Sequence, residues 1–202
     1  MLIKKIFNPL AIIVFITGFV VTALEILGSR ILAPLTGVTV AVWSSIIMVI
    51  LIAIGLGYFV GGALVDKHKS RRVISSLLSL SSLAIFMLLW LKNQSFSLLF
   101  IGQNPSYRLI ALILSGLFFA LPGFLLGIIN SYTIKFSISS DKLIGPIHGL
   151  LYGIATMGSI LGVFLTGYFL VPNFSVSVIL IILGFALILG AILGEFIKED
   201  KI

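Results

Sequence analysis

Six long apolar segments, separated by short polar breaks, make up most of the 202-residue chain. Each has about the 20 residues that an α-helix needs to cross a lipid bilayer. The pattern predicts helices over residues 7–27, 40–65, 73–91, 109–129, 150–171 and 175–195. We therefore expect one all-α membrane domain over residues 1–202, with six transmembrane helices in contact with lipid.

The composition agrees with this assignment and narrows the chemistry. Hydrophobic residues make up 60% of the chain and charged residues 9%, whereas soluble domains are roughly 25% charged. The absence of cysteine excludes disulfides and thiolate metal sites. Although the net charge is +7, the basic residues lie in short clusters between apolar segments and form no basic face. Nucleic-acid binding is therefore not expected.

The basic residues instead predict an orientation in the membrane. With both termini in the cytoplasm, most of the basic residues fall on the cytoplasmic side: Lys4, Lys5, Lys67, Lys69, Arg71, Arg72, Lys135, Lys142, Lys198 and Lys201. Arg30, Lys92 and Arg108 fall on the other side. The positive-inside rule favours this arrangement, so we expect a multi-pass protein of the cell (inner) membrane with both ends cytoplasmic.

Glycine and proline positions predict how the helices pack. Pro122 should bend the fourth helix, where a stripe of small residues from Gly116 to Asn130 suits close packing. Four G-x-x-x-G units predict mainly contacts within the chain: Gly57 with Gly61, Gly149 with Gly153, Gly158 with Gly162, and Gly190 with Gly194. Residues 61–65, "GGALV", resemble residues 167–171, "GYFLV", as in a 3+3 inverted repeat.

Glu25 is the first candidate for a functional group. Gly18, Thr22, Glu25 and Ser29 share one face of the first helix, and a carboxylate there should face protein or water rather than lipid. In one interpretation, Glu25 and Arg30 anchor the first helix at the outer interface. They pair either with each other, if the helix ends at Gly28 and Ser29, or with other helices. In the other, Glu25 attracts a cation or a proton into an outward-facing vestibule. The substrate-binding candidates are then Glu25, Arg30, Thr22, Trp43 and Ser44.

The segment "GGALVDKHKSRR", residues 61–72, is the second candidate. It resembles the loop between helices two and three of major facilitator superfamily transporters, with Asp66, Arg71 and Arg72 matching directly. The resemblance implies a cytoplasmic gating loop, in which Asp66 bonds to a neighbouring helix end or to Arg71 or Arg72. The alternative is a loop that only follows the positive-inside rule.

No catalytic site is apparent in the sequence. His148 lies at the start of the fifth helix without a second residue at metal-ligand spacing, so we interpret it as an interfacial or capping residue. No nucleophile with a base, phosphate loop or paired carboxylate is present. We therefore expect no enzyme activity, no cofactor and no metal.

Two longer segments resemble the membrane region of bacterial spermidine synthase-like proteins, in which major-facilitator-like helices are fused to an aminopropyltransferase-like domain. The first runs from Gly18 to Arg72 and includes Glu25, Arg30 and Asp66, and the second runs from Gly149 to Phe174. The resemblance implies a six-helix bundle like half of a major facilitator fold. The chain stops at "GEFIKEDKI", so we expect no aminopropyl transfer by this chain alone.

Two functions follow from these observations. The first is binding or transport of a small cationic solute such as a polyamine, with a homo-oligomer or a second membrane subunit supplying the other half of the carrier. The second is a non-catalytic membrane anchor or scaffold for a separately encoded cytoplasmic aminopropyltransferase.

Overall fold

A computed structural model describes residues 9–94, 106–137 and 144–197 of the chain. Its main helices are α2 (Pro9–Thr36), α3 (Val40–Lys67), α4 (Arg71–Leu91), α5 (Tyr107–Phe136), α6 (Ile144–Leu165) and α8 (Val176–Glu195). The π-helical turn η3 (Thr166–Leu170) and the short α7 (Val171–Asn173) continue α6. The described residues thus form six spans long and apolar enough to cross a membrane, without a strand, which confirms the predicted all-α membrane fold.

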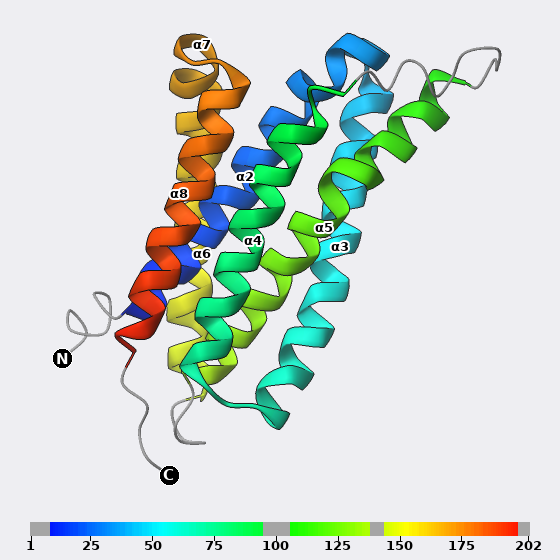
Figure 1. Cartoon of the computed structure of the whole chain (residues 1–202). Helices are drawn as coiled ribbons and strands as arrows, with labels where there is room; N and C mark the ends of the chain where they lie inside the picture. Colours follow the sequence, from blue (N-terminus) through cyan, green and yellow to red (C-terminus); the bar gives the residue numbers. More distant parts are fainter. Residues whose placement is uncertain (1–8, 95–105, 138–143, 198–202) are drawn as a thin grey trace.

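Figure 1 shows the spans side by side, with the start of α2 and the end of α8 at the same end of the bundle. We call this the terminal end and the other the opposite end. Lys67, Arg71 and Lys135 lie at the terminal end, and Arg30 and Lys92 at the opposite end. The predicted charge difference between the ends therefore holds for the described residues. Five members of the predicted pattern, Lys4, Lys5, Lys142, Lys198 and Lys201, lie outside the described residues.

The first helix is longer than predicted. It runs past Leu27 to Thr36, with Pro34 inside it. Gly28 lies within the helix, and α3 packs closely against it. A Cβ at this position would come 2.8 Å from a methyl group of Ile46. The helix ends instead at Thr36 and is followed by Gly37, whose positive φ of 71° favours glycine. The expected turn at Gly28 and Ser29 is therefore wrong.

Close contacts at glycine join α3 to α5. A Cβ on Gly57 would lie 2.3 Å from the carbonyl oxygen of Phe124, and one on Gly61 would lie 2.4 Å from that of Ile128. In return, a Cβ on Gly127 would lie 2.5 Å from the carbonyl oxygen of Ile54. Only hydrogen fits at these positions, so this part of the predicted small-residue packing is confirmed.

The same pattern joins α2 to α6. A Cβ on Gly158 would lie 2.2 Å from the carbonyl oxygen of Phe15, and one on Gly162 would lie 2.6 Å from that of Phe19. In return, a Cβ on Gly18 would lie 2.2 Å from the carbonyl oxygen of Ala155. These contacts pair each α2 residue with an α5 residue a fixed number of positions later in the sequence, as Gly18 pairs with Gly127. A second fixed difference in residue number pairs α3 with α6, as Gly57 pairs with Gly158. We call these two differences the offsets.

A pair of hydrogen bonds follows the same two offsets. Thr22 of α2 donates its hydroxyl to the carbonyl oxygen of Ser159 of α6 over 3.0 Å. Its counterpart Ser131 of α5 donates to the carbonyl oxygen of Tyr58 of α3, also over 3.0 Å. Helix contacts between and within the two halves match in the same way: α4 packs on α5 as α8 packs on α2. The chain is therefore built as an inverted 3+3 repeat.

The register of the repeat differs from the one predicted. The sequence similarity aligned Gly61 with Gly167, but the counterpart of Gly61 in the structure is Gly162. No atom lies within 4 Å of a Cβ built on Gly167. The register of the repeat is fixed by the glycines that make close helix contacts. Comparing the sequences of two short glycine-rich segments does not show which glycines these are.

Candidate functional site

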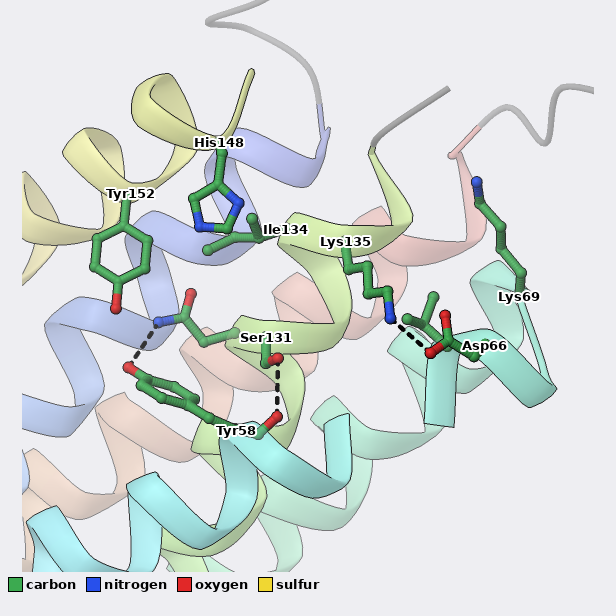
Figure 2. A pocket seen from close by; sticks show the side chains of 10 residues that line it. Tyr58, Asp66, Lys69, Ser131, Ile134, Lys135, His148 and Tyr152 are labelled. Atoms are coloured by element: carbon green, nitrogen blue, oxygen red, sulfur yellow. Dashed lines mark hydrogen bonds and ion pairs between the residues drawn. The ribbon is translucent and has the colours of Figure 1, made fainter. Parts of the chain in front are cut away.

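A polar cavity of about 620 Å³ opens at the terminal end of this largely apolar bundle. It lies between α3, α5 and the start of α6, and Figure 2 shows side chains from these three helices pointing into it. Its lining consists of Tyr58, Val65, Asp66, Lys69, Asn130, Ser131, Ile134, Lys135, His148 and Tyr152.

Charged residues surround the mouth of this terminal-end cavity. The Nζ of Lys135 donates to Asp66 Oδ2 over 2.6 Å and to the carbonyl oxygen of Gly62 over 3.0 Å. Lys69 places its Nζ 5.8 Å from the centre of the Phe136 ring. Because both partners of the ion pair are largely exposed, the pair adds little stability, but it neutralises one of the two lysines.

Deeper in the cavity, three uncharged polar side chains converge. Asn130 Nδ2 donates to the Tyr58 hydroxyl over 3.5 Å, and Tyr152 points its hydroxyl toward the same place (Figure 2). The Tyr152 ring stacks on His148 with centroids 5.7 Å apart. The carbonyl oxygen of the Asn130 side chain is buried and accepts no hydrogen bond from the described residues. A ligand that donates hydrogen bonds would satisfy it.

Tyr58, Asn130 and Tyr152 also line a smaller chamber of about 150 Å³, which continues between α2, α3, α5 and α6. This inner chamber lies on the pseudo-twofold axis of the repeat, since most of its lining falls into pairs related by the two offsets. These pairs are Thr17 with Leu126, Gly18 with Gly127, Val21 with Asn130, Ile54 with Ala155, and Tyr58 with Ser159. Carriers built from inverted repeats bind solute at such an interface, near the bilayer midplane.

The predicted gating loop is held to α5 rather than closed on itself. The Tyr132 hydroxyl accepts the backbone N–H of Ser70 over 2.9 Å and donates to the carbonyl oxygen of His68. Arg71 donates to the carbonyl oxygen of Ile197 over 3.2 Å. Of the two arrangements expected for Asp66, the structure has the bond to a neighbouring helix end. A gating role for Asp66, Arg71 and Arg72 stays a prediction.

The predicted substrate residues lie toward the opposite end. Thr22 is engaged with α6, Arg30 and Ser44 are exposed, and Trp43 is partly exposed in the first turn of α3. Glu25 is half-buried, and no hydrogen bond or ion pair joins its carboxylate to the described residues. None of these five residues lines the terminal-end cavity or the inner chamber.

Sequence reasoning missed the residues at the floor of the cavity. In the sequence, Asn130 stood out only as the end of the small-residue stripe that starts at Gly116, and Tyr152 only as part of the segment from Gly149 to Phe174. An amide inside an apolar span was the available signal, because a buried polar group in a membrane needs a partner. Among the described residues, no three His, Cys, Asp or Glu side chains gather as they would around a metal.

Comparison of the chain with protein-family models, curated proteins and solved structures found no match. The resemblance to spermidine synthase-like membrane proteins and to half of a major facilitator fold therefore stays a prediction. What stands is a polytopic, all-α membrane protein with six spans and a polar cavity.

Proposed function

We propose that this protein is a membrane carrier unit that binds a small amine, such as a polyamine, in the terminal-end cavity. The observation that carries the proposal is the buried carbonyl oxygen of Asn130, which accepts no hydrogen bond from the described residues and lies in a cavity lined by Tyr58 and Tyr152. An ammonium group has only donors to offer. It would satisfy this oxygen in a cavity that two tyrosine rings help to line, and such rings attract cations.

The position of the inner chamber supports transport rather than binding alone. It lies beyond the cavity on the axis of the inverted repeat, where rocking of one half against the other changes access in carriers. We expect the working carrier to contain a second six-helix unit, either another copy or a different subunit. The terminal end would face the cytoplasm, as the basic residues predict.

Equilibrium binding of labelled spermidine to the purified chain tests the proposal. Asn130→Leu removes the acceptor while keeping a similar volume, and should weaken binding about tenfold, the usual cost of losing a hydrogen bond to a charged group. Ser115→Ala is the matched control, because Ser115 is also in α5, buried and unpaired, but lines neither the cavity nor the chamber.

Uptake of spermidine into liposomes containing only this protein separates a carrier from a binding protein. The same tenfold difference between Asn130→Leu and Ser115→Ala is expected in uptake at low spermidine concentration. Equal binding by the two variants, or no binding by the unaltered chain, would refute the amine site.

A further inference from the structure

The inverted repeat relates Glu25 to a residue that lines the terminal-end cavity. The α2-to-α5 offset makes Glu25 the counterpart of Ile134, and the α3-to-α6 offset makes Thr166 the counterpart of Val65. Ile134 and Val65 both line the terminal-end cavity. Glu25 and Thr166 therefore hold the inverted positions at the opposite end of the bundle, where two apolar lining residues are replaced by a carboxylate and a hydroxyl.

The contacts of α2 place both residues on the same interface. Gly18 and Thr22 face α6, and Glu25 follows on the same side of the helix, two turns after Gly18. On α6, Gly162 packs against α2 at the level of Phe19 and Thr22. Thr166 comes one turn later and starts η3, which itself contacts α2. The register of the two helices thus places Glu25 and Thr166 at about the same level.

Thr166 is itself unusual. Its side chain is fully buried, and its hydroxyl has no hydrogen-bond partner among the described residues. It begins a π-helical turn, in which the N–H of Val171 bonds back to the carbonyl oxygen of Thr166. Such turns are rare in proteins, and those that occur are often found at functional sites. Together with the unpaired carboxylate of Glu25, this leaves two polar groups without hydrogen-bond partners among the described residues, at about the same level of the contact between α2 and α6.

We propose that Glu25 and Thr166 form a second ammonium-binding site, the inverted counterpart of the terminal-end cavity, through which the amine passes at the opposite end. The proposal rests on the proposed function for the identity of the ligand. A carboxylate and a hydroxyl oxygen are both acceptors, so they match an ammonium group and disfavour an anion. The site explains why a half-buried carboxylate is retained in a membrane span.

Cysteine labelling tests the site directly, because the chain contains no cysteine of its own. Gly167→Cys places a reporter beside Thr166, and the open space around Gly167 accommodates the side chain. His148→Cys places a matched reporter in the terminal-end cavity. Each variant is reconstituted in liposomes and labelled by a membrane-impermeant maleimide from the side its reporter faces, with increasing spermidine.

Spermidine should slow labelling of both reporters. Adding Glu25→Gln should raise the spermidine concentration for half-protection of Gly167→Cys about tenfold, and should leave that of His148→Cys unchanged. Glu25→Asp keeps the charge and should retain protection, which separates loss of charge from misfolding. The proposal is overturned if Gly167→Cys is never labelled, is not protected, or is protected equally with Glu25→Gln. Loss of protection at His148→Cys alone would instead refute the proposed cavity.

Discussion

Replacing a glycine at a helix contact by alanine should separate the two halves of the repeat, and Gly158→Ala is the sharpest case. The new Cβ would lie 2.2 Å from the carbonyl oxygen of Phe15, whereas ordinary contacts begin at 3.4 Å. Because that oxygen belongs to a helix backbone and cannot rotate away, α2 and α6 must move apart by roughly 1 Å, which forfeits about a quarter to a half of the dispersion energy of the contacting atoms.

We expect Gly158→Ala to lower the free energy of unfolding by about 1–3 kcal/mol, the usual cost of overpacking, reduced by up to about 1 kcal/mol because alanine favours helix more than glycine does. The inverted counterpart Gly57→Ala, whose Cβ would lie 2.3 Å from the carbonyl oxygen of Phe124, should cost a similar amount. The two changes lie in different helix pairs, so their effects should add.

Gly153→Ala is the matched control. It lies in the same helix, but no atom is within 4 Å of its Cβ, so it should stabilise the protein by about 0.5–1 kcal/mol through helix propensity alone. Unfolding in mixed micelles, followed by circular dichroism, is measured for the unaltered protein, the three single variants and the double variant with Gly57→Ala and Gly158→Ala. If Gly158→Ala proves as stable as Gly153→Ala, α2 and α6 do not pack as described, and the register of the repeat falls with them.

Three further predictions concern hydrogen bonds and charge. Tyr132→Phe removes the hydroxyl that holds the loop between α3 and α4, so it should cost about 1–3 kcal/mol and speed proteolysis between Lys67 and Ser70. Thr22→Val and Ser131→Ala remove the two symmetry-related bonds and should each cost about 0.6 kcal/mol; markedly unequal costs in the unfolding assay would argue against equivalent bonds. Asp66→Asn breaks an exposed ion pair, so it should change the unfolding free energy by less than about 1 kcal/mol, and a larger loss would show that the pair is structural.

Hydropathy was sufficient to find all six spans, because the bilayer sets their length independently of their neighbours. The end of α2 was not predictable in the same way. Gly28 and Gly37 look alike in the sequence, yet one is needed for contact with Ile46 and the other for its positive φ. Which of these roles a glycine has depends on the helix that packs beside it. The residues near the glycine in the sequence do not identify that helix.

The cavity could not be predicted for a related reason. Tyr58, Asn130 and Tyr152 come from three different helices, and they converge only because α3 packs on α5 and both leave space beside α6. Glu25, by contrast, stood out as a carboxylate in an apolar span. The glycine contacts that relate the two halves make Glu25 the counterpart of Ile134, so the sequence indicated the residue but not its surroundings.

The two halves of the repeat share the close backbone contacts between their helices but differ in the side chains at paired positions. This difference gives the two ends of the bundle different properties. Asp66 and Lys135 form an ion pair at the terminal end, whereas the same two offsets place Gly167 and Ile26 at their counterpart positions. An exact repeat would bind a solute equally at both ends. Here the terminal end has Lys69 and the ion pair of Asp66 with Lys135 above an uncharged polar floor, and the opposite end has the unpaired carboxylate of Glu25. A positively charged solute would therefore meet a different free energy at each end of the same path.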